Sequence, residues 1–328
     1  MVPKLSDDSY FNRAKKGGVT SCNATMLMPW DDFRRSIERI AYYYMWMNKY
    51  KDKSILATTA KDIENAKKEG KNAIIFGPQN ADMIENKLYL LKVFHQLGVR
   101  IIQLTYNELN LLGAGCVEKV DPGLSLFGMN AVEEMNRLGI LIDLSHCGVI
   151  TTNDAIELSK DPVLFTHTGP RDRFDHIRNK YDYQIKALAE KGGLVSLTAF
   201  AACNVKEYGV PATFADLLDC IDHVVNLVGV DHVGFGTDFE EDPDEISVDL
   251  WRPDGRPEII SRISPEEAYR IYSAGQPREK IGLRADFNSV EHFPRLTMGL
   301  VNRGYSDNEI TKILGGNYLR VFKKIWGK

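Results

Sequence analysis

The chain has 328 residues, of which 44% are apolar and 26% charged, and its formal net charge is -4 at pH 7. This composition is typical of a globular protein with a large core, and the small negative charge argues against nucleic acid as a partner. No stretch approaches the roughly 18 apolar residues of a membrane-spanning helix, and the five cysteines show no paired spacing, so we expect a cytoplasmic protein with free thiols and no membrane partner.

Short apolar runs rich in β-formers alternate along the chain with helix-like segments. This order predicts a parallel sheet, and the near-continuous apolar character of the runs predicts helices on both of its faces. In chain order the runs are VTSCNA (19–24), NAIIFG (72–77), RIIQLT (100–105), ILIDLS (140–145), VLFTH (163–167), LVSLTAF (194–200) and HVGFGTD (232–238).

We therefore expect an α/β fold, a (β/α)₈ TIM barrel that fills residues 1–328 as a single domain, with extra C-terminal helices from about residue 260 to 328. Seven strands are visible, whereas such a barrel needs eight. The remaining strand would be the first, and its only candidate is MVPKL at residues 1–5. We accordingly expect strand one to be clipped or completed by residues ahead of Met1.

Polar side chains stand where the predicted strands end. Because the C-terminal ends of barrel strands meet on one rim, these side chains should lie together. Taken singly, each is more often a loop cap or a satisfied core residue; two imidazoles and a carboxylate on neighbouring strands, however, suit Zn²⁺. The residues are Gln79, Tyr106, Asn107, His146, His167 and Asp238.

Five segments, spread along most of the chain, carry a recognisable pattern: GVRIIQLTYNELN, GLSLFGMNAVEEMNRLGILIDLSHCG, VLFTHTGPRDRFDHIRN, GVDHVGFGTDF and LVNRGYSDNEITKILGGNYLRVF. On these segments the chain resembles the membrane (renal) dipeptidase family of metallopeptidases, a branch of the amidohydrolase-type barrels. The resemblance implies a metal-dependent hydrolase barrel in which His146 and His167 bind zinc. It also implies that Asp238 handles the proton at the reacting centre and that Arg178 pairs with the substrate's terminal carboxylate. The alternative for Arg178 is a surface arginine paired with Asp175 or Asp182.

Three departures from the family pattern suggest a divergent bacterial subgroup. The family's first strand carries an H-x-D that holds one zinc, and Met1–Pro3 offer no such residues. Gln79 replaces a bridging glutamate, and Tyr106 replaces a histidine. A neutral amide cannot hold two dications together, so we expect at most one zinc per chain, held by His146, His167 and Gln79, with no zinc as the alternative.

These residues predict a hydrolase of a dipeptide-like or small amide substrate that uses water activated by at most one metal ion. Asp238 would move the proton, and Arg178, Tyr106 and Asn107 would bind a small molecule that carries a carboxylate. Two alternatives stay open: a metal-free barrel enzyme that acts on a small carboxylate-bearing, amino-acid-like compound, and a non-catalytic binding protein. The oligomeric state is also open, with a homodimer as one alternative.

Overall fold

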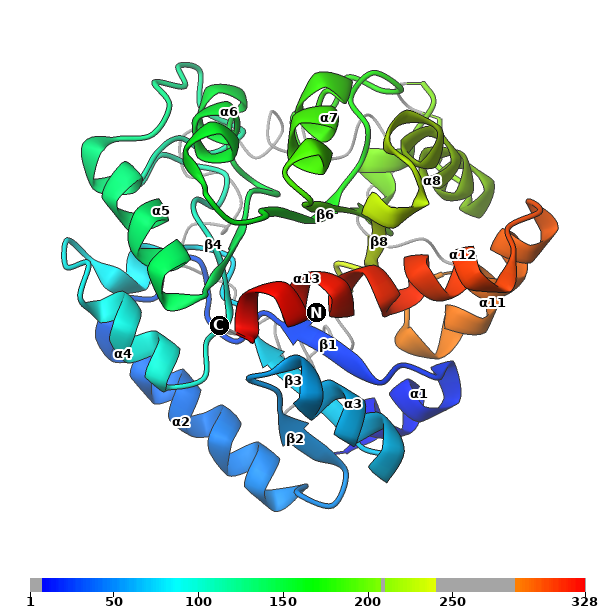
Figure 1. Cartoon of the computed structure of the whole chain (residues 1–328), viewed down its shortest axis with the longest axis horizontal. Coiled ribbons are helices and arrows are strands. Elements are labelled where there is room, and N and C mark those ends of the chain that lie inside the picture. The colour runs from blue at the N-terminus through cyan, green and yellow to red at the C-terminus, as the bar shows by residue number, and fades with distance from the viewer. Residues whose placement is uncertain (1–7, 208–209, 240–286, 328) are drawn as a thin grey trace.

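The computed structural model describes residues 8–207, 210–239 and 287–327. Eight strands run through this part of the chain, with helices outside them (Figure 1). The strands are β1 (Ser21–Ala24), β2 (Ser54–Leu56), β3 (Asn72–Phe76), β4 (Ile101–Gln103), β5 (Leu141–Asp143), β6 (Leu164–Thr168), β7 (Leu194–Thr198) and β8 (Val233–Gly236).

All strand pairings are parallel. Strands β4 to β8 form one sheet in chain order, while β3 pairs with β1 on one side and β2 on the other. A parallel bridge between Phe76 and Val99 leads from β3 to β4. Seen down the short axis of the molecule, the strands surround its centre and the helices surround the strands (Figure 1). The expected α/β barrel class is confirmed.

The expected position of the first strand is wrong. MVPKL lies outside the described residues, and the segment predicted from residue 19 forms β1 itself, the first of the eight described strands. The strand that the pattern missed is β2, Ser54–Leu56, which has only three residues. β4 and β5 have three residues as well, but they lie within longer apolar runs, whereas the apolar run ILA of β2 stands between the polar segments KDKS and TTAKD.

The two faces of the strands bury different apolar sets. Ile74, Ile102 and Phe165 belong to the large cluster between strands and helices, whereas their neighbours Ile75, Ile101 and Leu164 belong to a second cluster. Alternate side chains of a strand point to opposite faces, so the second cluster fills the barrel interior. Both faces are covered, as the apolar runs predict.

Helices follow most of the strands, and their ends have local causes. Asp32 caps α2, where its Oδ1 accepts from the Arg35 amide at 2.9 Å, and Gly139 ends α5 with φ 71°. The helices of the barrel are α1 (Ser9–Gly17), α2 (Phe33–Lys49), α3 (Ala60–Glu69), α4 (Leu90–Gln96), α5 (Leu126–Leu138), α6 (Val149–Leu158), α7 (Asp182–Glu190) and α8 (Phe214–Val228).

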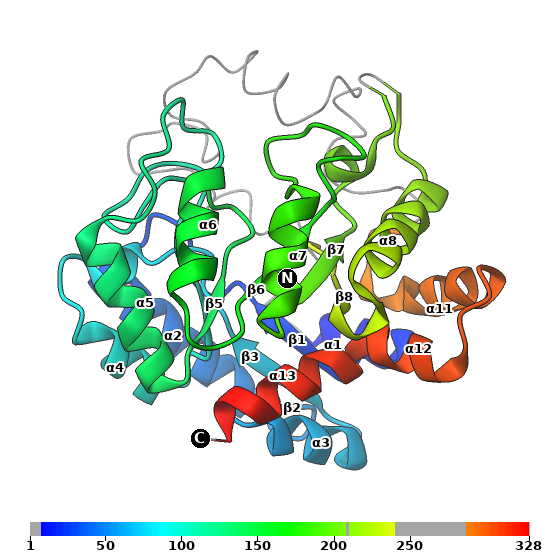
Figure 2. The ribbon, with the colours of Figure 1, turned by 45° about the horizontal axis from the view of Figure 1, so that its top comes forward.

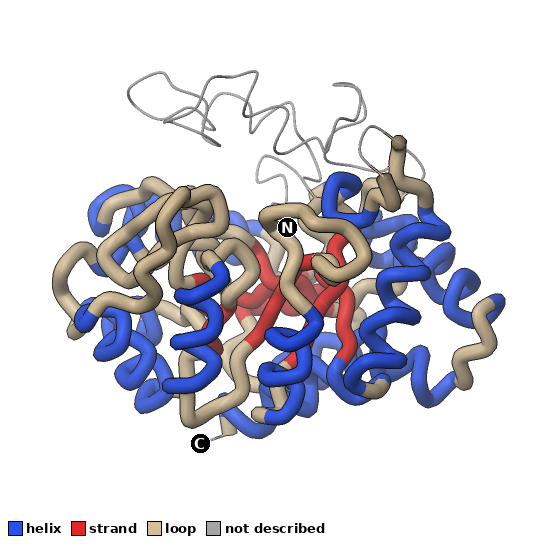
Figure 3. The backbone as a smooth tube through the Cα atoms, turned by 90° about the horizontal axis from the view of Figure 1, so that it is seen from above, coloured by secondary structure: helices blue, strands red, loops and turns tan. Residues whose placement is uncertain are grey.

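The C-terminal helices close one end of the barrel. Val321, Phe322 and Ile325 of α13 complete the interior cluster, and Figure 2 shows α13 at the end of the barrel away from the long loops. Those loops gather at the opposite end (Figure 3). Within the described part of the chain no helix is long and apolar enough to cross a bilayer. These last helices are α11 (Phe293–Asn302), α12 (Asp307–Thr311) and α13 (Asn317–Trp326).

Candidate active site

Two histidines face each other at the loop end of the barrel. His146 follows β5 and His167 lies in β6, and both are buried, at 1% and 4% exposure. Their ring centroids are 5.0 Å apart and their Nε2 atoms 2.9 Å apart. The pairing of β6 with β7 shifts register between Phe165 and Thr168, an irregularity of the kind that re-aims side chains beside active sites.

The outer nitrogen of each ring has an acceptor. Nδ1 of His146 lies 2.7 Å from Oδ1 of Asn107, and Nδ1 of His167 lies 2.7 Å from Oγ1 of Thr166. That hydroxyl donates its own proton to Oδ2 of Asp143 at 2.6 Å, so it accepts from His167. Both neutral rings therefore carry their proton on Nδ1, which leaves the Nε2 lone pairs directed at each other.

Asp143 holds this arrangement in place by accepting hydrogen bonds, a role that sequence reasoning missed. Its carboxylate also accepts from the Ser145 amide at 3.0 Å, the Ser145 hydroxyl at 2.6 Å and the Thr166 amide at 3.0 Å. The signal was present in the sequence, because a carboxylate inside the apolar run ILIDLS must be satisfied by buried donors.

Gln79 and Asp238 lie beside the histidine pair. Gln79 Nε2 is 3.5 Å from His167 Nε2, and its side chain also hydrogen-bonds to Asp238. Burial opposes ionisation of Asp238, but attraction to His167 and Arg178 holds the pKa of this carboxyl below its usual value. Asp238 is thus ionised near neutral pH, and its backbone adopts a positive φ of 56°.

Arg178 is a buried residue rather than a surface arginine. It is 2% exposed, and its guanidinium lies 3.5 Å from the His167 carbonyl. The aspartates nearest in sequence have other partners, since Asp175 pairs with Arg171 at 2.5 Å and Asp182 with His223 at 2.8 Å. The surface-pair alternative for Arg178 is therefore wrong.

Both histidines are held in the neutral form. Burial lowers the pKa of His146 well below its usual value, and the nearby positive charges of Arg178 and Lys180 lower it further. Burial also lowers the pKa of His167, although Asp238 acts in the opposite direction. A proton shared between the two rings is therefore disfavoured near neutral pH.

Lys180 is a second residue that sequence reasoning missed. It is 3% exposed, and its ammonium donates to the Cys147 carbonyl at 2.7 Å and to the Thr152 hydroxyl at 3.2 Å. Burial lowers its pKa to about 8. These two hydrogen bonds connect the loop after His146 to the first half of α6. The residues around position 180 form no apolar pattern that would predict a buried side chain there.

The rim carries neutral side chains that could ligate a metal ion. At the first strand, corrected to β1, residues Asn23 to Thr25 supply no histidine and no carboxylate. Across the described ranges no group of three or more His, Cys, Asp or Glu side chains is placed to hold a metal. The two bare Nε2 atoms, with the Gln79 amide beside them, could hold a metal ion.

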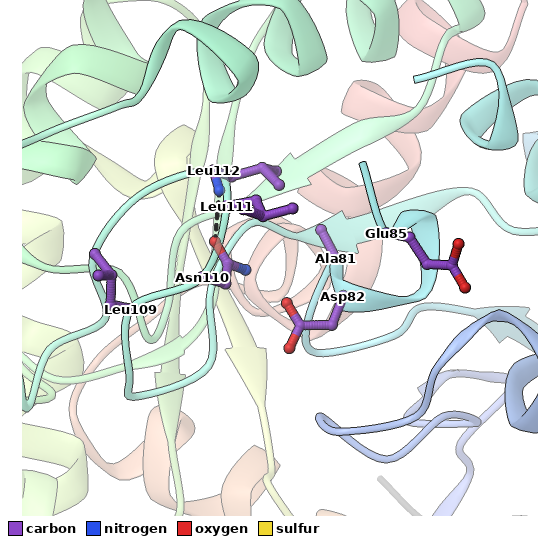
Figure 4. A pocket seen from close by; sticks show the side chains of 7 residues that line it. All are labelled: Ala81, Asp82, Glu85, Leu109, Asn110, Leu111 and Leu112. Carbon is purple, nitrogen blue, oxygen red and sulfur yellow. Dashed lines mark hydrogen bonds between the residues drawn. The ribbon is translucent and has the colours of Figure 1, made fainter. Parts of the chain in front are cut away.

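A separate pocket of about 420 Å³ opens beside the rim (Figure 4). It lies between the loops that follow β3 and β4, and no side chain of the seven predicted site residues lines it. Beneath it, Asn110 donates to the Asn80 side chain at 2.9 Å and joins the two loops. The pocket is lined by Ala81, Asp82, Glu85, Leu109, Asn110, Leu111 and Leu112.

Comparison with known proteins places this geometry in a family. The chain is 27% identical over 294 residues to dipeptidase tcpJ of Claviceps purpurea, covering 89% of this chain and 60% of that protein. It is 28% identical over 299 residues to dipeptidase verJ of Clonostachys rogersoniana, covering 90% and 66% respectively. The chain thus spans less than two thirds of the length of these curated relatives.

A solved structure and a family model extend the likeness to nearly the whole chain. An amidohydrolase from Pseudomonas aeruginosa superposes with a TM-score of 0.82 at 34% identity, covering 98% of this chain and 94% of that one. The model of the membrane dipeptidase family matches residues 8–262 and 275–326. The chain therefore belongs to the membrane dipeptidase family, peptidase family M19.

Proposed function

We propose that this protein is a metal-dependent hydrolase of dipeptide-like or small amide substrates. The observation that carries the proposal is the pair of Nε2 atoms, 2.9 Å apart, on two rings whose protons are both engaged at Nδ1. Two lone pairs at this distance repel each other unless a cation lies between them. The dipeptidase names of the curated relatives support the same substrate class.

His146 and His167 would hold one ion, with the Gln79 amide as a neutral third ligand. When bound there, Zn²⁺ would act as a Lewis acid that polarises the substrate carbonyl and acidifies water. Both imidazoles are already neutral and oriented by Asn107 and by Thr166, so this chain's residues hold the ligand geometry before an ion arrives. Two ions would need a carboxylate bridge, which an amide at position 79 does not provide.

Asp238 and Arg178 would act on the substrate. The Asp238 carboxylate is half-buried and ionised beside His167, so it is suited to accept a proton from the attacking water and to pass it to the leaving nitrogen. The Arg178 guanidinium is buried at the same place and is suited to hold a substrate carboxylate through two parallel hydrogen bonds. Together they would orient the scissile bond over the histidine pair.

A metal-free enzyme is a second candidate, and Gln79 favours it. The hydrogen bond of the Gln79 side chain to Asp238 engages both residues without a metal. Such a site would bind a small amino-acid-like compound through Arg178.

Elemental analysis of protein purified without chelators separates the two candidates. The proposal expects one zinc ion per chain, together with hydrolysis of dipeptides that stops on chelation and returns when zinc is added back. Metal-free protein that hydrolyses dipeptides at the same rate, or zinc-loaded protein that hydrolyses none of a broad dipeptide panel, would contradict it.

We also propose that the whole chain forms one barrel domain and that it works in the cytoplasm. All five cysteines are free, and four of them are buried. Buried free thiols are typical of proteins in a reducing compartment.

A further inference from the structure

The backbone is strained where the chain leaves β4. Asn107 has a positive φ of 62°, and the Glu108 amide donates to the Tyr106 carbonyl at 2.6 Å. A hydrogen bond that spans three residues around a positive φ marks a γ-turn of the rare, strained form. Strain of this kind persists only where surrounding contacts hold it, and it concentrates at functional sites.

The turn brings two consecutive side chains onto one imidazole. The Tyr106 ring stacks on the His146 ring, with centroids 4.1 Å apart and planes 24° apart. Oδ1 of Asn107 lies 2.7 Å from Nδ1 of the same ring. Consecutive residues of an extended strand point in opposite directions, so only a sharp turn allows both to contact His146.

The loop that follows holds the turn and His146 to each other. The Val117 amide donates to the Asn107 carbonyl at 3.0 Å, and the Cys116 amide donates to the His146 carbonyl at 2.8 Å. Gly115 permits this approach, because a Cβ there would lie 2.1 Å from the Asn107 carbonyl carbon. The position of His146 relative to Asn107 is thus set by backbone contacts as well as by side chains.

We propose that Tyr106 and Asn107 form a clamp that fixes the ring plane and the Nδ1-protonated tautomer of His146. The inference rests on the proposed function, in which Nε2 of His146 is the atom that binds the ion. The clamp makes both residues positioning residues, a different role from the substrate binding that the sequence predicts for them. Tyr106 limits rotation of the ring, and Asn107 selects its tautomer.

The tautomer is measured directly in metal-free protein labelled with ¹⁵N at histidine. Long-range ¹H–¹⁵N spectra distinguish a protonated ring nitrogen from a bare one, and the signals of His146 are those missing in His146→Gln. We expect wild type to show a single tautomer, protonated on Nδ1. Asn107→Gly keeps the positive φ but removes the acceptor, so His146 should become a mixture of tautomers. A single Nδ1-protonated tautomer in this variant would overturn the proposal.

Two further variants isolate the acceptor from the backbone. Asn107→Asp tolerates the same φ and retains an oxygen at Oδ1, so it should keep the wild-type tautomer. Glu85→Gly is the matched control, because Glu85 also has a positive φ, 51°, and lies outside the histidine pair. It should leave the His146 signals unchanged. Equal loss of the tautomer in the Gly and Asp variants at position 107, or loss in the control, would count against the clamp.

Zinc titration of the same variants measures the consequence for binding. Losing an oriented outer partner of a ligating histidine costs about 10- to 100-fold in metal affinity. We therefore expect at least a tenfold rise of the zinc Kd in Asn107→Gly and in Tyr106→Leu, and less than a threefold change in Tyr106→Phe. Unchanged affinity in the first two would overturn the clamp. If wild type binds no zinc, the proposed metal site fails, while the tautomer spectra still decide the clamp.

Discussion

The rim of the barrel has two unlike halves. In β1 and after β3 and β4 the chain supplies neutral side chains, among them Asn23, Gln79 and Asn107. After β5, in β6 and after β8 it supplies His146, His167 and Asp238, which have perturbed pKa values; both histidines are buried and Asp238 is half-buried. The first half has neutral groups that orient, with Gln79 also a proposed neutral ligand, and the second half has the two imidazole ligands and the carboxylate that carries protons.

This difference shows how one half of a barrel site can serve the other. Asn107 directs the proton of His146, and the Gln79 side chain hydrogen-bonds to Asp238. A neutral amide can orient a ring or a carboxylate without adding the charge that a second ion requires. Variants in each half should therefore fail in different ways.

Removing a histidine from the ligating half should have the largest effect. His167→Ala leaves one imidazole, so we expect zinc affinity to fall by more than about 100-fold, beyond the loss typical of outer partners. Equilibrium dialysis with elemental analysis measures this. The matched control is His95→Ala in α4, which should bind zinc as wild type does. Wild-type affinity in His167→Ala would remove the distinction between the two halves.

Changing Arg178, the proposed binding residue for the substrate carboxylate, should alter the preference for substrates that carry a free carboxylate. Arg178→Lys keeps the charge but loses the planar fork, so kcat/KM should fall at least tenfold, about 1.4 kcal/mol, on dipeptides with a free carboxylate. Removing one partner of a buried charge pair altogether costs more, roughly 2–5 kcal/mol. The same dipeptides with an amidated C-terminus should be hydrolysed by wild type and variant at similar rates. Equal losses on both substrates would remove Arg178 from substrate recognition.

Adding a negative charge at position 79, in the neutral half of the rim, should strengthen metal binding at the site. Gln79→Glu places a carboxylate beside Asp238, and the repulsion between the two should lower the Tm of the metal-free protein. A cation relieves that repulsion, so zinc should bind about tenfold more tightly and raise the Tm by more than it does in wild type. Thermal unfolding with and without zinc measures both effects. Weaker zinc binding in the variant would mean that residue 79 does not face the ion.

The smallest expected effect concerns Lys180, whose hydrogen bonds hold the loop after His146 and which should affect the free energy of unfolding. Its pKa is about 8 when folded, against an ordinary value of 10.5, so from about pH 8 upward the unfolded chain holds a proton that the folded chain has released. The contribution of this group to the free energy of unfolding therefore rises with pH across that window. The stability difference between wild type and Lys180→Met should grow by about 1 kcal/mol from pH 7 to pH 9. Urea unfolding at both pH values measures it, and a constant difference would show that the ammonium is not buried.

The sequence by itself determined the barrel class and the two histidines. Apolar runs of strand length recur in it, and their order with helical segments specifies a parallel sheet because both signals are local. His146 and His167 could be picked out because each closes such a run, and strand ends converge in this fold. The first strand was misplaced because β2 was missed: its apolar run, ILA, is flanked by polar segments, unlike the longer runs that contain the equally short β4 and β5.

Only the tertiary structure decided which atoms of the site meet. The tautomers of both histidines depend on Asn107 and on Asp143, which lie 39 and 24 residues away from the rings that they orient. The burial of Lys180 and Arg178 likewise depends on how a loop folds back over the rim. Hydrogen bonds and burial between distant segments arise from three-dimensional packing, and local residue patterns do not encode them.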